Sequence, residues 1–275
     1  MSDRSTGAVP VPTTAPRREL GFKSDRVQRL RRLLRQPKWR AEESAFVIEG
    51  PKLLTAALDA GSTVESVYVA PGTAHEAVGR AEGVGVPIFT LAAGVIERVA
   101  DTVTPQGVLA VCTRTASPME NLRGTTMVIV AVGIQDPGNL GTIFRSAGAA
   151  TEAGVICCTG TVDPYNPKCL RASAGALFHQ KLVARKDPVE VLEELGSWGV
   201  QRLATEPSGG AAPDAYDLVQ PTALVFGNEG RGLDPALLRL VDGTVTIPMS
   251  GPAESLNVAM AATVVCFEAA RQRRQ

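Results

Sequence analysis

Apolar and polar positions alternate along the chain in blocks that predict helices and strands in turn. Apolar residues Val27, Leu30 and Leu34 share one helical face, which predicts a helix over 24–36. The following blocks predict strands near 44–48, 65–70, 87–90 and 107–113, and helices near 51–60, 74–82 and 91–99. This series is typical of a small α/β/α unit.

A second series begins after a polar stretch at 116–124, which has linker character. It predicts strands at 126–132, 154–158, 181–184, 200–204, 222–226 and 244–247, and helices at 139–149, 166–174, 188–197, 234–240 and 255–271. Strands alternating with helices favour a parallel sheet covered on both faces. Residues 206–216 predict a flexible loop. We therefore expect a disordered basic tail at 1–20, a first domain at 21–115, a linker at 116–124 and a second domain at 125–275.

Three polar, glycine-containing segments stand at the ends of apolar runs in the second domain. They are Gln135–Arg145, Phe226–Leu233 and Ile247–Ala259. In open α/β sheets, ligands bind beyond the carboxyl ends of the strands, so the three segments are expected to meet at one site. Taken alone, each is also typical of a tight turn before a capped helix, and Ser255 suits an N-cap of the last helix.

The three segments, in this order, resemble the three motifs of the SpoU (TrmH-type) family of RNA ribose 2′-O-methyltransferases, in the SPOUT superfamily. Residues 139–145, 226–233 and 247–258 match the motifs, and the resemblance covers 125–275. The stretch from about 40 to 113 is similar to the L30e-like substrate-binding domain that often precedes this core. Thiostrepton- and nosiheptide-resistance methyltransferases belong to the wider group, but the motifs do not single them out.

The resemblance implies a particular fold and assembly. We expect a C-terminal SPOUT α/β domain with a deep trefoil knot, whose threaded loops form the cofactor pocket, preceded by a small L30e-like α/β/α domain. It also implies a homodimer through the knot region, with the C-terminal helix in the interface. That helix is apolar at Val258, Val264 and Phe267, although a helix buried in a monomer core would look the same.

The resemblance implies methyl transfer from S-adenosylmethionine, without a metal, to a ribose 2′-hydroxyl. The L30e-like domain favours 23S rRNA as the substrate, with tRNA as the alternative. The expected cofactor-binding residues are Gly227, Asn228, Gly230, Ile247, Met249, Ser255 and Leu256. The expected catalytic residues are Arg145, Asn139, Glu229, Ser255 and Asn257.

Individual roles follow from the side-chain chemistry and the resemblance. Arg145 matches the family's catalytic arginine, and a guanidinium stays protonated, so we expect it to grip a substrate phosphate and steer or acidify the hydroxyl. Whether the arginine or the phosphate removes the proton is open. Asn139 can cap its helix or hold Arg145 and the neighbouring motif, while Glu229 can pair with Arg231 or organise the site across the dimer.

Charge is unevenly distributed along this neutral chain. Residues 1–40 hold eleven Lys or Arg against three Asp or Glu, a net charge of about +8, which leaves about −8 for the rest. Arg29, Arg32 and Arg35 on the predicted helix are therefore expected to bind RNA phosphates rather than form only a solvated face. Arg171 aligns with an arginine that relatives use near RNA, and a structural role explains it equally well.

Composition argues against several other classes. No run approaches the ~20 apolar residues of a membrane-spanning helix, and no signal-peptide core is present. Five cysteines without metal-ligand spacing predict buried reduced thiols and a cytoplasmic location, and two histidines disfavour a histidine metal site.

Two alternatives remain. A Rossmann-type enzyme needs a G-x-G-x-x-G run, but Asp136 stands where the first glycine would be. A non-catalytic RNA-binding or ribosome-assembly protein could keep this fold, but Arg145 and the third motif are intact.

Overall fold

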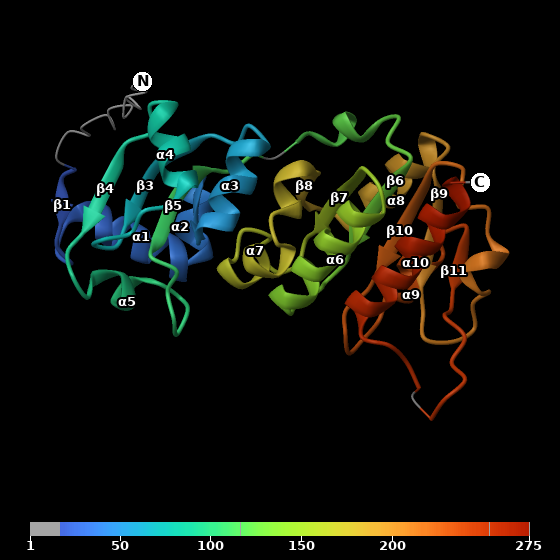
Figure 1. The fold of residues 1–275 in the computed structure, drawn as a ribbon. Coiled ribbons are helices and arrows are strands. Elements are labelled where there is room, and N and C mark those ends of the chain that lie inside the picture. The colour runs from blue at the N-terminus through green and yellow to red at the C-terminus, as the bar shows by residue number, and fades with distance from the viewer. Residues whose placement is uncertain (1–16, 116, 253, 275) are drawn as a thin grey trace, which may run out of the picture.

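The computed structural model describes residues 17–115, 117–252 and 254–274, which form two α/β domains lying side by side (Figure 1). Most of the predicted disordered tail at 1–20 therefore lies outside the described residues. Each domain is built on its own sheet, with five strands in the first and six in the second.

The first sheet has the strand order β1-β4-β3-β5-β2. Its strands are β1 (Glu19–Leu20), β2 (Ala45–Glu49), β3 (Val64–Val69), β4 (Ile88–Leu91) and β5 (Val108–Thr113). The helices are α1 (Asp25–Arg35), α2 (Pro37–Glu42), α3 (Pro51–Asp59), α4 (Glu76–Gly83) and α5 (Val95–Val99). Neither β1 nor α2 was predicted. Helix α5 starts later than the predicted 91–99, because Leu91 belongs to β4 and Gly94 is left-handed at φ 76°.

The second sheet has the order β11-β9-β10-β6-β7-β8, and its strand pairs are parallel, as predicted. Its strands are β6 (Met127–Ala131), β7 (Ala153–Cys158), β8 (Lys181–Lys186), β9 (Gln201–Thr205), β10 (Thr222–Phe226) and β11 (Gly243–Val245). The helices are α6 (Pro137–Ala150), α7 (Pro167–Ser173), α8 (Pro188–Ser197), α9 (Pro235–Leu238) and α10 (Val258–Arg273).

Helices cover both faces of the second sheet, which explains its uninterrupted apolar strands. Met127, Ile129 and Ala131 of β6 share one core cluster with α6 and α10, while Val128 and Val130 belong to the cluster under α8 and α9. Helix α10 lies directly against α6. The predicted trefoil knot stays a prediction; β10 lies between β9 and β6 in the sheet, and α10 returns to the α6 face.

The two domains are packed together rather than tethered. One core cluster contains buried residues of both, and the Phe46 ring lies 4.6 Å from that of Tyr165. Arg40 pairs with Asp163 at 2.7 Å, with both side chains almost fully buried. Residues 117–124 of the predicted linker also pack on the second sheet, because Met119 and Leu122 are buried against it.

Residues 206–216, predicted as a flexible loop, are held along β11. The Glu206 amide donates to the Val245 carbonyl at 3.0 Å, and the Ala211 amide donates to the Thr244 carbonyl at 3.0 Å. Gly210 permits this close approach, because a β-carbon there would lie 2.4 Å from the Thr244 oxygen. The loop composition therefore reflects tight backbone packing.

The five cysteines are free and buried, as the sequence predicted. Burial raises the pKa of the Cys158 and Cys266 thiols to about 12, so these groups stay protonated at neutral pH. In the described part of the chain, no helix is long and apolar enough to cross a membrane.

Candidate functional site

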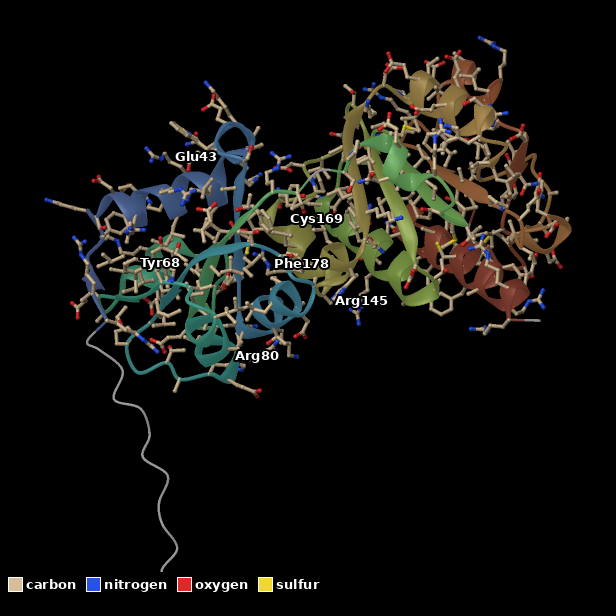
Figure 2. All side chains as sticks on the ribbon, turned by 90° about the horizontal axis from the view of Figure 1, so that it is seen from above. Glu43, Tyr68, Arg80, Arg145, Cys169 and Phe178 are labelled. Atoms are coloured by element: carbon tan, nitrogen blue, oxygen red, sulfur yellow. The ribbon has the colours of Figure 1, made fainter. Side chains whose placement is uncertain are left out.

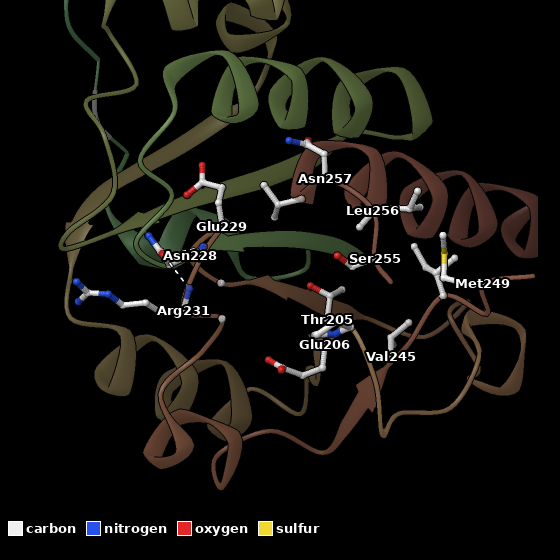
Figure 3. Close-up of a pocket in the computed structure, with 17 residues that line it drawn as sticks. Thr205, Glu206, Asn228, Glu229, Arg231, Val245, Met249, Ser255, Leu256 and Asn257 are labelled. Carbon is white, nitrogen blue, oxygen red and sulfur yellow. Dashed lines mark hydrogen bonds between the residues drawn. The ribbon is translucent and has the colours of Figure 1, made fainter. Parts of the chain in front are cut away.

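A cavity of about 500 Å³ opens at the carboxyl ends of β9, β10 and β11 (Figure 3). All seven predicted cofactor-binding residues lie on its wall: Gly227, Asn228, Gly230, Ile247, Met249, Ser255 and Leu256. Val245 and Ile247 give it an apolar side, while Asn228 and Ser255 supply polar groups. Its size and mixed lining are those of a small-molecule site.

Tight turns shape the segment after β10. Asn228 fixes the turn, since its side chain donates to the Gly133 carbonyl at 2.8 Å and accepts from the amides of Gly230 and Arg231 at 3.0 Å. A β-carbon on Gly227 would lie 2.6 Å from the Gly232 carbonyl carbon. Gly227 therefore lets the loop fold on itself at this point, and its expected role in binding the cofactor stays a prediction.

Three predicted catalytic residues meet at the edge of this cavity. The Asn139 side chain donates to Glu229 at 3.1 Å, and the Asn257 side chain donates to the Asn139 oxygen at 3.1 Å. Each residue comes from a different motif, so the chain of hydrogen bonds joins all three motifs. Asn139 does not cap α6; Asp136 does, by accepting from the amides of Gly138 and Asn139 at 2.6 and 3.0 Å.

Glu229 is held by donors on several sides. The Gln135 amide donates to its carboxylate at 3.0 Å and the Asp136 amide at 3.1 Å. Burial acts to raise the pKa of Glu229, but these hydrogen bonds together outweigh it and lower the pKa below its usual value. A carboxylate so stabilised is a poor proton acceptor. Among the described residues it forms no ion pair with Arg231, and its hydrogen bonds join the first two motifs within one chain. Its expected role across a dimer stays a prediction.

Helix α10 begins at Val258 rather than at the predicted residue 255. Asn257 is its N-cap, and its side chain accepts from the Ala259 amide at 2.9 Å. Asn caps helices as well as Ser does, so the preceding residues remain in the loop. Ser255 is thereby exposed on the cavity wall, which corrects its expected role as the cap.

Arg145 is not among the residues that line this cavity. It follows Asn139 by six residues on α6, which turns it by about 240° and moves it about 9 Å along the axis. Ser146 faces α10 through a 2.6 Å hydrogen bond to Thr263, whereas Gly141 and Gly148 face α7 and the turn after it. Arg145 lies exposed on that second flank, toward the first domain (Figure 2).

The arginines predicted to bind RNA are partly engaged elsewhere. Arg29 pairs with Glu43 at 2.6 Å and with Glu65 at 2.8 Å. Arg32 lies over the Trp39 ring at 4.6 Å, while Arg35 is exposed. Arg171 pairs with Asp101 of the first domain at 3.2 Å, which favours a structural contribution. The predicted RNA contacts of these residues stay predictions.

Sequence reasoning missed several residues of the site. Glu206 and Thr205 line the cavity, and the backbone amides of Gln135 and Asp136 hold Glu229. Glu206 directly follows β9, so the same rule about the carboxyl ends of strands could have found it. Within the described residues, no group of three or more His, Cys, Asp or Glu side chains could hold a metal ion.

The parallel sheet, the cavity at its carboxyl edge and the three joined segments together define an α/β protein with a small-molecule site beyond its strand ends. The family model described as "SpoU rRNA Methylase family" matches residues 126–267, and one described as "MRM3-like substrate binding domain" matches residues 24–110. The chain therefore belongs to the SpoU rRNA methylase family, which confirms the resemblance drawn from the three motifs.

Individual relatives agree with this assignment. The 23S rRNA (guanosine(2553)-2′-O)-methyltransferase RlmP of Bacillus subtilis is 36% identical over 85% of this chain and 92% of its own length. The SpoU methyltransferase AviRb from Streptomyces viridochromogenes superposes with a TM-score of 0.83 at 29% identity, covering 91% of this chain and 98% of that one. AviRb in complex with S-adenosylmethionine gives 0.82 at 30% identity, covering 91% and 99%.

The cavity fits the cofactor of this family. S-adenosylmethionine carries an adenine with flat aromatic faces, a polar ribose and a charged amino acid, and the cavity offers apolar residues on one side and polar groups on the other. This agreement supports S-adenosylmethionine as the methyl donor of this enzyme.

Proposed function

We propose that this enzyme methylates a ribose 2′-hydroxyl of 23S rRNA in the cytoplasm. The observation that carries the proposal is the hydrogen-bonded series Asn257–Asn139–Glu229, which joins the three motifs beside the cavity. The first domain supports an RNA substrate, since it matches a substrate-binding family model. tRNA remains the alternative substrate.

Bound S-adenosylmethionine would supply an electrophilic methyl group on a sulfonium, and the chain's own residues would orient the RNA. Gly227, Asn228, Gly230, Ile247, Met249, Ser255 and Leu256 would hold the cofactor. The Asn139 and Asn257 amides would position the acceptor hydroxyl near the methyl group, where alignment supplies much of the rate enhancement. Glu229 would keep Asn139 in place, since its carboxylate is already saturated by donors.

Arg145 would act through the RNA rather than through the cofactor. Its exposed position on the flank of α6 supports a grip on a phosphate next to the target ribose. A permanently protonated guanidinium there would hold that phosphate and so orient the target ribose. Arg171, with Asp101 across the domain junction, would border the same RNA path.

Two copies of the chain would pair through α10. Met260, Val264 and Phe267 are spaced by four and three residues, so they form one stripe, and they are 60%, 42% and 44% exposed. An apolar stripe of this kind supports an interface between copies. Phe267→Glu should halve the mass measured by light scattering without changing the circular dichroism spectrum; an unchanged dimer mass would exclude this interface.

The test of function is transfer of tritium from labelled S-adenosylmethionine to 23S rRNA and, separately, to tRNA. We expect label in 23S rRNA with the natural enzyme. Arg145→Ala should abolish transfer and keep cofactor affinity, while Arg239→Ala, a change of another exposed arginine, should retain activity. RNA binding without transfer would favour the non-catalytic alternative. Mapping ribose methylation in a deletion strain and its parent would then locate the nucleotide.

A further inference from the structure

Glu206 lies in the cofactor cavity but outside all three motifs. It follows the last residue of β9, and its backbone is fixed on both sides. Its amide donates to the Val245 carbonyl at 3.0 Å, and its own carbonyl accepts from the Thr246 hydroxyl at 3.1 Å. The side chain therefore starts from a rigid point on the cavity wall.

One carboxylate oxygen of Glu206, Oε1, is buried and has no hydrogen-bond partner among the described residues. The carboxylate lies against Gly232, where both oxygens would be 3.7–3.8 Å from an added β-carbon. Burial raises the pKa of this carboxyl, and a hydrogen bond from the Leu233 backbone opposes the rise only in part. A buried acceptor without a hydrogen bond costs stability unless a ligand donates to it.

The second carboxylate on this wall, Glu229, has no such vacancy. Its oxygens accept from the Gln135 and Asp136 amides and from the Asn139 side chain. Glu206 is thus the acid on the wall that has a buried oxygen without a hydrogen-bond partner among the described residues. The cofactor offers several donors: two ribose hydroxyls, the adenine amino group and the α-ammonium group.

The residues that line the cavity indicate which of these donors would face Glu206. Val245 and Ile247 offer the apolar surface suited to the adenine ring, while Asn257 marks the end where the methyl group must meet the RNA. Glu206 lies between Val245 and the loop at Gly232, and its carboxylate points away from Ser255 (Figure 3). The ribose is the part of the molecule that joins the adenine to the sulfonium.

We propose that the Glu206 carboxylate accepts hydrogen bonds from the ribose hydroxyls of S-adenosylmethionine and so selects a ribonucleoside cofactor. An acidic side chain near the carboxyl end of a parallel strand reads a ribose diol in the same chemical way in dinucleotide-binding folds. This inference rests on the proposed function, because it assumes that the cofactor occupies this cavity.

The experiment is calorimetric titration of the natural enzyme and Glu206→Gln with S-adenosylhomocysteine and its 2′-deoxy and 3′-deoxy analogues. The natural enzyme should bind at least one deoxy analogue about 10- to 100-fold more weakly than the parent compound, the range of a charge-assisted hydrogen bond. Glu206→Gln should bind the parent compound more weakly by a similar factor and should lose most of this discrimination. Glu193→Gln, which changes an exposed acid on α8 outside the three motifs and away from the cavity, should behave like the natural enzyme.

Other outcomes would overturn the inference. Equal affinity of Glu206→Gln and the natural enzyme for the parent compound would mean that the carboxylate is not used. Retained discrimination in the variant would show that Glu206 only shapes the loop. An effect on S-adenosylmethionine but not on S-adenosylhomocysteine would assign it to the sulfonium, and an effect absent with 5′-methylthioadenosine would assign it to the amino acid. Failure of the natural enzyme to bind both S-adenosylmethionine and S-adenosylhomocysteine would instead contradict the proposed function.

Discussion

The buried pair between Arg40 and Asp163 gives the sharpest test of how the two domains are joined. Arg40 Nε lies 2.7 Å from Asp163 Oδ2, and the two side chains are 1% and 7% exposed. Arg40 Nη1 also donates to the Leu33 carbonyl at 2.7 Å, at the end of α1. The side chain thus completes a helix end in the first domain and meets a carboxylate of the second.

The structure sets the size of the expected effect. Asp163→Asn keeps the shape but leaves Arg40 buried without a counter-charge, which costs about 3–5 kcal/mol of unfolding free energy. Arg40→Met should cost a similar amount, because Asp163 loses its partner and the Leu33 carbonyl loses a donor. The double variant should be about 2–3 kcal/mol more stable than the sum of the two effects predicts, since neither charge is then left alone.

Urea unfolding followed by circular dichroism measures these free energies. We expect one transition in the natural protein, because a single core cluster contains residues of both domains. The control is Arg80→Ala, whose partner Asp59 lies at 2.6 Å but whose pair is 42% and 49% exposed, so no measurable change is expected. If Asp163→Asn costs less than about 1 kcal/mol, water screens the pair and it does not lock the domains.

Three further predictions concern RNA binding, the cofactor loop and acid stability. Arg35→Gln should lower the salt slope of RNA binding by about 0.7–0.9 in filter-binding assays. Arg29→Gln should instead lower the stability of the fold, because the Arg29 guanidinium pairs with Glu43 and Glu65. Equal slopes for Arg35→Gln and the natural enzyme would rule out the phosphate contact of Arg35. Gly227→Ala should abolish cofactor binding in calorimetry, because the added carbon would push the loop away from Gly232. The control Gly251→Ala, with nothing within 4 Å of the added carbon, should bind the cofactor normally. Normal binding by both variants would refute the packing argument. Because folding lowers the pKa of Glu229, its stabilising contribution is present above its ordinary pKa and is lost as pH falls through the lower folded value. Acidification from about pH 5 to pH 3 should therefore lower the urea unfolding free energy of the natural enzyme more than that of Glu229→Gln. Parallel pH curves for the two proteins would contradict this prediction.

Local patterns in the sequence were enough to predict the second sheet and the position of the cavity at its carboxyl edge. Strands buried on both faces read as continuous apolar runs, and β6 and β10 stand where those runs predicted them. The rule that sites form at the carboxyl ends of parallel strands then placed three separated segments together. All seven residues predicted to bind the cofactor line one cavity.

The features that the sequence did not predict depend on distant partners. Strand β1 has two residues and is defined by pairing with β4, about seventy positions later. The contacts of Arg29 and Arg40 also depend on distant residues, since a basic helical pattern does not indicate that Glu65 and Asp163 are their partners. The start of α10 could not be predicted either, because Ser255 and Asn257 cap helices about equally well and the structure uses Asn257.

The locked junction has a consequence for how RNA reaches the site. The buried pair of Arg40 with Asp163 and the shared core fix the first domain against the second, in which α7 packs on α6, the helix that carries Asn139 and Arg145. A hinge closure of the two domains around RNA would have to break a buried ion pair and open a shared core, at a cost of several kcal/mol. The geometry therefore favours a preformed surface on which the RNA itself bends or unpairs to present its ribose. Substrates in which the target nucleotide is already unpaired should then be methylated faster than the same sequence held in a duplex.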